Sequence, residues 1–591
     1  MANVNIKING KAYSVPAEYT ILQAAKDAGI DIPTLCYLKD INEIGACRMC
    51  LVEIKGARAL QASCVYPVSE GLEILTNSPK VRKARKANLE LILSNHDRKC
   101  LTCVRSENCE LQKLSKELNV TDIPFEGENI NYPIDDLSAS IVRDNNKCIL
   151  CRRCISVCNN IQTTGVIDCQ NRGFNTEVGV PFNKSLNDSS CIMCGQCITA
   201  CPVGALREKS HIERVWDALA TEGKHVVVQT APAVRVALGE AFGMPIGTRV
   251  TGKMVSALKA LGFARVFDTN TAADLTIMEE GHELLGRINN SGTLPMITSC
   301  SPGWIKFCEH YFPEFIPNLS SCKSPHTMFG ALIKSYYAQK EGIKPEDIYV
   351  VSIMPCTAKK YEIDRPEMEC DGNRDVDAVL TTRELARMIK EARIDFVNLE
   401  DDEFDMPFGP ASGAGVIFGA TGGVMEAALR TVGEILKGSP LDDIDITSCR
   451  GQDGIKEFEV ALPDITVKGC VVNGTGNARK VLEKVKSGEA DYHFIEVMGC
   501  PGGCITGGGQ PIVDAKTKAS VNVFELRAKA IYDEDKSLPI RKSHENPVIQ
   551  ELYKEFLGEP NSHKAHSLLH TSYTEREHYS ADYMNKPDLG E

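Results

Sequence analysis

Two runs of four cysteines with the same spacing constrain this chain more than any other feature. Each run has the pattern C-x2-C-x2-C-x3-C, and the second run is followed directly by Pro202. In bacterial two-cluster ferredoxins, the fourth cysteine of each run binds the cluster of the other run. The sequence therefore predicts two 4Fe-4S cubes, one held by Cys148, Cys151, Cys154 and Cys201, and the other by Cys191, Cys194, Cys197 and Cys158.

Four earlier cysteines follow a segment that predicts a small sheet. Apolar residues alternate from Val4 to Ile8, a hairpin turn is expected at Asn9-Gly10, and TILQAAKDAG predicts a short helix. Two irons bridged by two sulfides need two protein ligands each, so four thiolates on this scaffold suit a 2Fe-2S cluster. Structural zinc is the alternative, although it usually takes two close cysteine pairs. The four predicted ligands are Cys36, Cys47, Cys50 and Cys64.

A third group of ligands follows a predicted helix. The segment VRKARKANLELILSNHDRKC places Leu89, Ile92 and Leu93 on one side of that helix. A 4Fe-4S cube needs four ligands, and three nearby cysteines leave one position for a histidine. Imidazole in place of thiolate removes negative charge and raises the reduction potential of the cluster. The predicted ligands are His96, Cys100, Cys103 and Cys109.

Composition limits the kinds of partner. The 591 residues suggest about four domains at roughly 150 residues each. The formal net charge of -13 leaves no basic stretch of the kind that a nucleic acid or an anionic membrane would require. No apolar run approaches the length of a membrane span, and no export signal opens the sequence. We therefore expect a cytoplasmic protein, in which 25 cysteines indicate metal ligation rather than disulfides.

Residues from about 210 to 525 predict a different architecture. Strand-like runs such as HVVVQ, IYVVSIMP and DYHFIEVM alternate with helical patterns such as TTRELARMIKEA. This alternation predicts an α/β fold with two sheet-containing lobes. Cysteines occur here in three motifs, TSCSPGW, MPCTAKKYE and EVMGCPGGCITGGGQP.

These three motifs, in this order, resemble those of the FeFe hydrogenases, and the resemblance covers nearly the whole sequence. It implies an enzyme that interconverts protons, electrons and hydrogen at an H-cluster. This cofactor is a 4Fe-4S cube joined through one cysteine to a diiron subsite with carbonyl, cyanide and a bridging dithiolate. Matching the motifs makes Cys356, Cys500 and Cys504 ligands of the cube, with Cys504 as the bridge to the diiron subsite. Residues matched to the surroundings of the cluster are Met354, Pro355, Lys359, Met498 and Gly503.

Two further expectations concern lysines and glycines in these motifs. Lys359 can donate a hydrogen bond to a negatively charged cyanide, whereas the adjacent Lys360 is expected to be a solvated surface residue. The glycines are expected to let the backbone approach the cluster without side-chain obstruction. They are Gly507, Gly508 and Gly509.

The resemblance also implies a route for protons between the cluster and solvent. It consists of a cysteine thiol, two glutamates, a serine and an arginine near the exit. The residues at the matching places are Cys300, Glu280, Glu283, Ser320 and Arg287.

The loop TSCSPGW departs from the family, which usually has two adjacent cysteines, the first relaying protons and the second binding the cube. This chain has Cys300-Ser301 instead. A gapless match makes Cys300 the relay and puts Ser301 at a ligand position. The softness of iron-sulfur clusters favours Cys300 as the ligand, with the Ser301 hydroxyl passing the proton. Both interpretations remain open at this point, and we favour ligation by Cys300.

Together these features predict a multidomain chain of α+β and α/β type with one 2Fe-2S cluster, three 4Fe-4S clusters and one H-cluster. The expected modules are a β-grasp 2Fe-2S ferredoxin module (1–78), a helical His/Cys cluster module (79–138), a bacterial two-4Fe-4S ferredoxin module (139–209), a two-lobed α/β H-cluster domain (210–525) and a C-terminal segment that wraps the core (526–591). The other cysteines are expected to be buried or free thiols, namely Cys169, Cys308, Cys322, Cys370, Cys449 and Cys470.

A row of clusters reaching far from the active site suits electron exchange with other proteins. The expected partners are a flavin subunit that binds NAD(P), a ferredoxin-like subunit or soluble ferredoxin, within a hetero-oligomeric complex. One alternative is a hydrogen sensor or an iron-sulfur assembly protein with the same fold, supported by the Cys300-Ser301 change. A molybdenum or tungsten formate dehydrogenase could share the N-terminal clusters, but the catalytic half does not fit that class.

Overall fold

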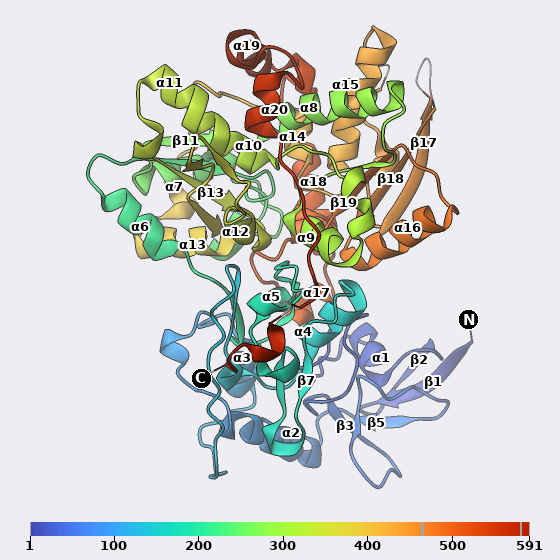
Figure 1. Ribbon diagram of the computed structural model, residues 1–591. Coiled ribbons are helices and arrows are strands. Elements are labelled where there is room, and N and C mark those ends of the chain that lie inside the picture. Colours follow the sequence, from blue (N-terminus) through green and yellow to red (C-terminus); the bar gives the residue numbers. More distant parts are fainter. Residues whose placement is uncertain (1, 442, 462–465, 580–581, 590–591) are drawn as a thin grey trace.

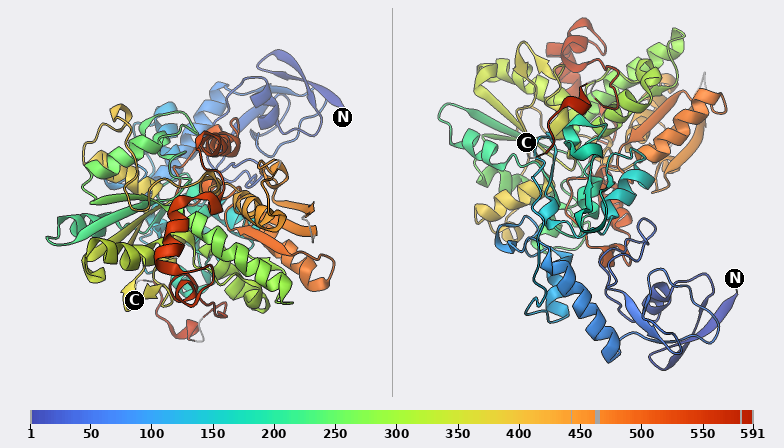
Figure 2. Two further views of the ribbon diagram at one scale, coloured as in Figure 1. Left: turned by 90° about the horizontal axis from the view of Figure 1, so that it is seen from above. Right: turned by 60° about the horizontal axis from the view of Figure 1, so that its bottom comes forward.

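The computed structural model describes residues 2–441, 443–461, 466–579 and 582–589. A large α/β body contains the catalytic half, and three smaller cysteine-rich modules lie beneath it in Figure 1. The N-terminal module projects at one corner, away from the large body (Figures 1 and 2). This arrangement confirms the multidomain α+β and α/β class that the sequence predicts.

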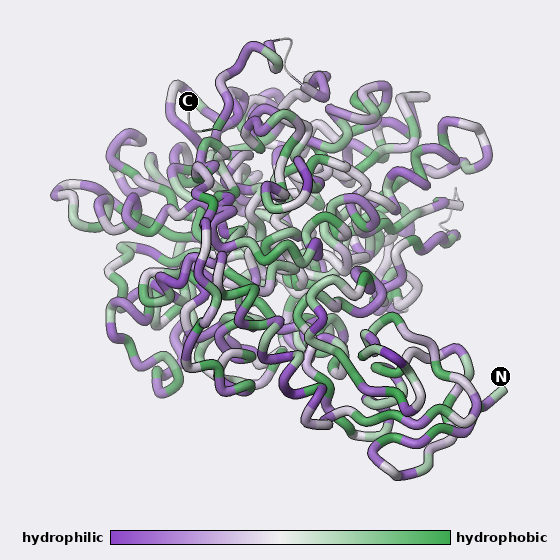
Figure 3. The backbone as a smooth tube through the Cα atoms, turned by 90° about the horizontal axis from the view of Figure 1, so that it is seen from below, coloured by the Kyte–Doolittle hydropathy of each residue, from purple (hydrophilic) through white to green (hydrophobic). Residues whose placement is uncertain are grey.

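The N-terminal module is a five-stranded sheet crossed by one helix. The predicted hairpin is present, and its turn residues Asn9 and Gly10 both have positive φ, at 52° and 83°. Thr20 caps the helix through a reciprocal capping box with Gln23. Figure 3 shows this module at the edge of the molecule with hydrophobic segments of its own. In sheet order the strands are β2 (Lys11–Pro16), β1 (Asn3–Ile8), β5 (Glu73–Leu75), β3 (Leu51–Ile54) and β4 (Gln61–Ala62), and the helix is α1 (Ile21–Asp27).

The next module is less helical than the sequence suggests. Helix α2 (Pro79–Ser94) begins at the side-chain cap of Ser78 and buries Leu89 and Leu93. It is followed by the short turn η1 (Cys100–Thr102) and helix α3 (Glu110–Glu117). Most of residues 118–138 form no regular structure. The expectation of helix across the whole of 79–138 was therefore wrong for its last third.

The ferredoxin module shows its internal repeat in the backbone. Helices α4 (Arg153–Ser156) and α5 (Gln196–Ala200) each start after a residue with left-handed backbone, Arg152 and Gly195. Each of those residues directly follows the second cysteine of its run, so the two runs fold alike. Two short antiparallel ribbons complete the module, β6 (Ile141–Arg143) with β9 (Leu206–Glu208), and β7 (Asp168–Gln170) with β8 (Glu177–Gly179).

The catalytic half contains two four-stranded sheets, as the sequence predicts. The first is entirely parallel and has the order β11 (Arg265–Asp268), β10 (His225–Thr230), β13 (Ile348–Met354) and β16 (Ala378–Thr381). The second has the order β12 (Met296–Ile297), β19 (Phe494–Met498), β18 (Thr466–Asn473) and β17 (Ile455–Ala461), with only β17 antiparallel. A small hairpin joins β14 (Glu369–Cys370) to β15 (Asn373–Arg374).

Helices surround both sheets in Figure 1. The long helix α8 packs against helices of both lobes, α10 and α15 among them, so it forms part of their shared core. The helices of this half are α6 (Ile212–Ala220), α7 (Thr251–Ala260), α8 (Thr269–Asn289), α9 (Pro302–Tyr311), α10 (Pro325–Leu332), α11 (Ala338–Glu341), α12 (Ala358–Glu362), α13 (Thr382–Glu391), α14 (Gly413–Ile417), α15 (Gly423–Lys437), α16 (Thr475–Ser487) and α17 (Ala515–Lys518).

The C-terminal segment lies along the catalytic half and the ferredoxin module. Helices α18 (Val523–Ser537), α19 (Pro547–Leu552) and α20 (His563–Leu569) pack on the catalytic half, and the chain then runs down to the ferredoxin module (Figure 1). There the Tyr583 hydroxyl donates a 2.8 Å hydrogen bond to the carbonyl of Pro181. The domain boundary predicted after residue 525 falls inside α18, so the structural break lies before Val523.

Lys360 is not the surface residue that the sequence suggests. It is fully buried on α12, and its ammonium lies 3.0 Å from the buried carboxylate of Glu384 on α13. Glu384 also forms the capping box of α13 with Thr381. The ion pair therefore joins two helices beside the motif that carries Cys356.

Replacing this lysine leaves a buried carboxylate without its counter-ion. We expect Lys360→Met to lower the free energy of unfolding by about 3–5 kcal/mol. Lys340→Met is the matched control, because Lys340 is 41% exposed and its ion pairs are long, so its loss costs about 0–1 kcal/mol. Anaerobic thermal unfolding of both variants measures the difference, and equal midpoints would contradict a structural role for the buried pair.

Candidate active site

Three cysteines from two lobes meet at the ends of parallel strands. Cys356 follows β13 of the first sheet, whereas Cys500 and Cys504 follow β19 of the second. Burial raises the pKa of Cys500 and of Cys504 to about 12, and the negative charge of the nearby Cys356 thiolate adds to both shifts. The structure thus brings together the three thiols that the motifs predict as ligands. A metal cluster at this point would relieve the burial cost of the thiolates, because ligation stabilises the deprotonated form.

The residues predicted to surround the cluster lie on the same strand ends. Met354 and Met498 are each 3% exposed, at the last positions of β13 and β19. Lys359 is also buried, and its ammonium donates to the carbonyl of Cys300 at 3.0 Å and to Glu362 at 2.8 Å. Pro355 and Gly503 directly precede Cys356 and Cys504.

Sequence reasoning missed the carboxylate that holds this lysine. Glu362 accepts hydrogen bonds from both Lys359 and the buried His326, at 2.8 and 2.5 Å. Burial lowers the pKa of His326 to about 4, and the charge of Lys359 lowers it further. Glu362 is the last residue of MPCTAKKYE, so its position within the motif was the available signal.

Gly507 and Gly508 lie against the backbone of other segments. A Cβ built there would lie 2.1 Å from the carbonyl oxygen of Cys194, and one at Gly507 would lie 2.2 Å from that of Pro355. These glycines therefore allow close contact between backbone segments, with Cys194 at Gly508 and with Pro355 at Gly507. The consequence is that the loop with Cys500 and Cys504 touches the ferredoxin loop with Cys194.

The eight cysteines of the ferredoxin module group as predicted. Burial raises the pKa of Cys151, and the charge of Cys201 from the other run is the next largest cause. Burial likewise raises the pKa of Cys197, followed by the charges of Cys194, Cys191 and then Cys158 of the first run. Each set of three thus has the fourth cysteine of the opposite run beside it, as a pair of cubes requires.

The four N-terminal cysteines form two close pairs. The Sγ atoms of Cys50 and Cys64 are 3.3 Å apart. The backbone amides of Cys36 and Cys47 each donate to the sulfur of the other, at 3.3 and 3.5 Å. Two pairs at one place fit a 2Fe-2S cluster, in which each iron takes two thiolates.

His96 lies with its three cysteines around a cavity of about 420 Å³. Its Nδ1 atom is buried without a hydrogen-bond partner among the described residues. Burial lowers the pKa of His96, which keeps the imidazole neutral and able to bind metal. Gly204 approaches Cys103 so closely that a Cβ would lie 2.5 Å from the sulfur, which places this module against the ferredoxin module.

His96→Cys tests that ligand. We expect the variant to retain its cluster and to shift one reduction potential by about 100 mV to more negative values, because thiolate adds negative charge. Anaerobic redox titration followed by electron paramagnetic resonance measures the shift. His310→Cys is the control, since the His310 imidazole bonds the carbonyl of Glu577 in the C-terminal segment, at 2.8 Å. Identical potentials in His96→Cys and the parent protein would show that His96 is not a ligand.

The predicted proton route forms a connected row of side chains. Glu280 is 1% exposed, and burial together with the charge of Glu283 raises its pKa to about 8. The Ser320 hydroxyl donates to Glu283 at 2.8 Å, and Arg287 pairs with the same glutamate at 2.7 Å. Glu283 and Arg287 are 14% and 16% exposed, so this end of the row reaches solvent.

Ser299 also belongs to this row, although the sequence did not single it out. Its hydroxyl lies 3.5 Å from Glu280 and 2.7 Å from the carbonyl of Cys322. It is the second residue of TSCSPGW, so proximity to Cys300 in the motif was the only signal.

Cys300 and Ser301 occupy different surroundings. Burial raises the pKa of Cys300 far above its usual range, and the charge of Glu280 is the next largest cause. Ser301 instead accepts a 3.1 Å hydrogen bond from the amide of Gly499, the residue before Cys500. The thiol thus neighbours Glu280 of the glutamate row, with Lys359 and Cys504 also close by. The Ser301 hydroxyl instead bonds the loop that carries Cys500.

The fold and the grouped thiols define an iron-sulfur oxidoreductase. Family models match along the chain: a 2Fe-2S iron-sulfur cluster binding domain (1–79), the NADH-ubiquinone oxidoreductase-G iron-sulfur binding region (85–124), a 4Fe-4S dicluster domain (147–205), the iron only hydrogenase large subunit, C-terminal domain (224–508), and the iron hydrogenase small subunit (521–576).

Two curated relatives match almost end to end. The NADP-reducing hydrogenase subunit HndD of Solidesulfovibrio fructosivorans is 50% identical, over 98% of this chain and 100% of its own length. Iron hydrogenase 1 of Clostridium pasteurianum is 45% identical, over 96% of this chain and 99% of its own. The chain therefore belongs to the iron-only (FeFe) hydrogenases and is an iron-sulfur enzyme of that family.

A solved structure and a distant relative complete the comparison. A variant of FeFe hydrogenase HydA1 from Chlamydomonas reinhardtii is 44% identical, with a TM-score of 0.56, and covers 62% of this chain and 100% of its own. The cytosolic Fe-S cluster assembly factor narfl of Danio rerio is 32% identical, over 60% of this chain and 87% of its own length. Among the described residues, none of the helices has the length and apolar character needed to cross a bilayer.

Proposed function

We propose that this hydrogenase contains one 2Fe-2S cluster, three 4Fe-4S clusters and an H-cluster, and passes electrons between hydrogen and an external acceptor. The observation that carries the proposal is the meeting of Cys356, Cys500 and Cys504 beside the ferredoxin loop of Cys194. The H-cluster supplies the metal chemistry of hydrogen activation when bound. These three thiolates would hold its cube, with Cys504 in the place of the family's bridging cysteine.

The buried side chains around those thiolates orient and neutralise the cluster. Met354 and Met498 exclude water, because both are almost fully buried at the strand ends. Lys359 presents an ammonium whose position is fixed by Glu362 and by the Cys300 carbonyl. A cation held in this way can donate to an anionic ligand of the diiron subsite.

We propose that Cys300 is the proton relay rather than a ligand of the cube. Its thiol has Glu280 as a charged neighbour, and Glu280 leads to Glu283, Ser320 and Arg287. Protons then pass between Cys300 and Glu280, and between Ser320 and Glu283, with Arg287 at the exit. This role follows the gapless match and departs from the ligation that soft-metal chemistry alone favours.

On this proposal Ser301 occupies the position of the family's fourth cube ligand. Its hydroxyl is fixed by the Gly499 amide, adjacent to Cys500. An oxygen at this position is a harder donor than a thiolate, so Ser301 would hold the cube less strongly than a cysteine would.

We propose an NADP-linked, cytoplasmic hetero-oligomer as the working form. The support is the 50% identical relative, whose printed name is a subunit of an NADP-reducing hydrogenase, and the row of modules leading away from the active site (Figure 1). On this proposal a flavin subunit exchanges electrons with the clusters, and ferredoxin or a ferredoxin-like subunit is the other acceptor.

The purified, anaerobically matured chain tests the acceptor. We expect it to reduce methyl viologen with hydrogen but not NADP+, because on this proposal the flavin that converts single electrons into hydride belongs to a separate subunit. Reduction of NADP+ should appear only in the isolated multisubunit complex. Direct reduction of NADP+ by the chain alone would overturn the proposal.

The alternative of an iron-sulfur assembly protein has one point in its favour, the 32% identical assembly factor. That relative covers only 60% of the chain, and the glutamate row of the hydrogenases is complete here. A protein that only assembles clusters has no need of buried proton-carrying groups. Hydrogen turnover is therefore the function that the site supports best.

A further inference from the structure

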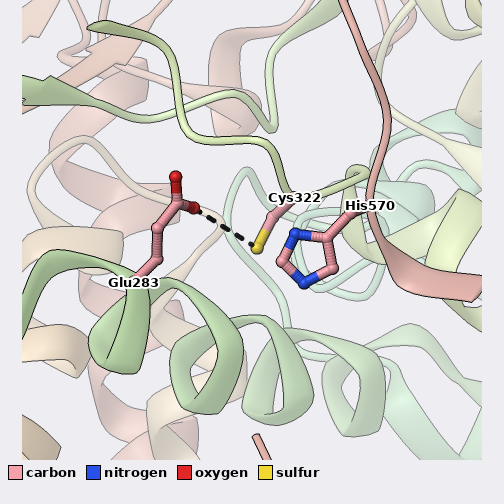
Figure 4. Close-up of side chains that lie close together, drawn as sticks. All are labelled: Glu283, Cys322 and His570. Atoms are coloured by element: carbon pink, nitrogen blue, oxygen red, sulfur yellow. Dashed lines mark hydrogen bonds between the residues drawn. The ribbon is translucent and has the colours of Figure 1, made fainter. Parts of the chain in front are cut away.

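A cluster of three different ligand types lies beside the proton route. Glu283 comes from α8, Cys322 from the loop before α10, and His570 from the residue after α20 of the C-terminal segment. One ligand atom of each lies within 4.8 Å of the others. Figure 4 shows the Cys322 thiol between the Glu283 carboxylate and the His570 imidazole. Cys322 is fully buried, and the His570 side chain is 2% exposed.

The hydrogen bonds of His570 prepare it for a metal. Its Nε2 lies 3.1 Å from the buried carboxylate of Glu279, and its Nδ1 lies 2.8 Å from the hydroxyl of Ser321. A carboxylate on Nε2 fixes the proton there and leaves the electron pair of Nδ1 to accept from the Ser321 hydroxyl. That hydroxyl can rotate away when a metal ion binds Nδ1. Histidines that bind metals usually have such a carboxylate behind them.

The ligand set favours a borderline divalent ion. Thiolate, imidazole and carboxylate are the three side chains that zinc takes in proteins, and three protein ligands leave a fourth position for water. Glu283 is 14% exposed next to Arg287, which gives an ion a path from solvent. The Cys322 thiol, which lies 4.0 Å from Glu283, would lose its proton to solvent on binding.

We propose that Glu283, Cys322 and His570 form a zinc site that blocks the proton relay when it is filled. The blocking role rests on the relay proposed above, because Glu283 accepts from Ser320 and passes protons to the exit. A metal bound to that carboxylate removes the lone pair that Ser320 uses, and its positive charge repels protons. Zinc therefore acts as a reversible inhibitor through side chains that are not among the predicted cluster ligands.

A second group of potential ligands provides the contrast. Glu434, His544 and Glu545 are also close together. However, this group has no thiolate, and the Lys542 ammonium bonds two of its three members, Glu434 at 3.0 Å and Glu545 at 2.9 Å. In the proposed site, Arg287 pairs only with Glu283. We expect no tight zinc binding there, which makes His544→Gln the matched control.

The experiment uses the anaerobic holoenzyme and Zn²⁺. Hydrogen oxidation with methyl viologen gives the half-inhibitory zinc concentration, and equilibrium dialysis gives the bound zinc per chain. We expect Cys322→Ala and His570→Gln each to raise the half-inhibitory concentration by about 100-fold, relative to their own zinc-free rates, and to lose one tightly bound zinc. His544→Gln should behave like the parent enzyme.

Three outcomes distinguish failure of the zinc site, of its blocking role and of the hydrogenase function. Equal zinc binding and inhibition in the parent and both site variants would overturn the site. Loss of one bound zinc in the variants, without any inhibition of the parent, would overturn the blocking role and count against Glu283 as a relay. Failure of the hydrogenase function itself would show as absent turnover before zinc is added.

Discussion

Cys300→Ala is expected to lower hydrogen turnover by about 100- to 10,000-fold, the range that a positioned acid-base group contributes. The infrared signature of bound carbonyl and cyanide should remain, because on our proposal the Cys300 thiol passes protons to its neighbour Glu280, whereas Cys356, Cys500 and Cys504 hold the cube. Proton transfer from a buried cluster fails without the thiol, since the remaining row begins only at Glu280.

Ser301→Cys is the companion variant for this prediction. It creates the two adjacent cysteines usual in the family, so it should keep both turnover and the complete cluster. Rates and infrared spectra of the two variants, measured after the same maturation, give the comparison. Loss of the active-site cluster in Cys300→Ala would show instead that Cys300 binds the cube and that Ser301 passes the proton.

Cys504→Ala should abolish hydrogen turnover altogether. Cys504 is the proposed bridge between cube and diiron subsite, so its removal should also abolish the carbonyl and cyanide bands. The accessory clusters should survive, because their ligands belong to separate modules. Electron paramagnetic resonance of the reduced variant measures those clusters independently of activity.

Cys470→Ala is the matched control, since Cys470 is a buried thiol of β18 with no ligand motif around it. It should keep turnover and both sets of spectroscopic signals. Full carbonyl and cyanide bands in Cys504→Ala would contradict the proposed bridging role.

The groups of neighbouring cysteines could be predicted because they follow from local spacing. Short spacings such as C-x2-C-x2-C-x3-C follow from the size of a cube, so one stretch of chain supplies most ligands of one cluster. The alternation of strands and helices could also be predicted from the sequence, and the catalytic half contains both expected sheets. These features depend on periodicity and spacing, which a sequence displays directly.

Other features depended on contacts between distant segments. Lys360 was assigned to the surface because its partner Glu384 lies on another helix, and no local pattern reveals a buried ion pair. The same holds for His570, which reaches Glu279 from nearly 300 residues away along the chain. Residues 118–138 were expected to be helical but are mostly irregular. Polar composition alone does not distinguish a solvated helix from an irregular segment.

Infrared spectroscopy of the anaerobically matured chain tests the central claim most directly, because iron-bound carbonyl and cyanide absorb where protein does not. We predict such bands together with about 20 irons per chain when every cluster is present, and their loss in Cys504→Ala but not in Cys470→Ala. A fully matured, iron-replete sample without carbonyl and cyanide bands would contradict the H-cluster at Cys356, Cys500 and Cys504.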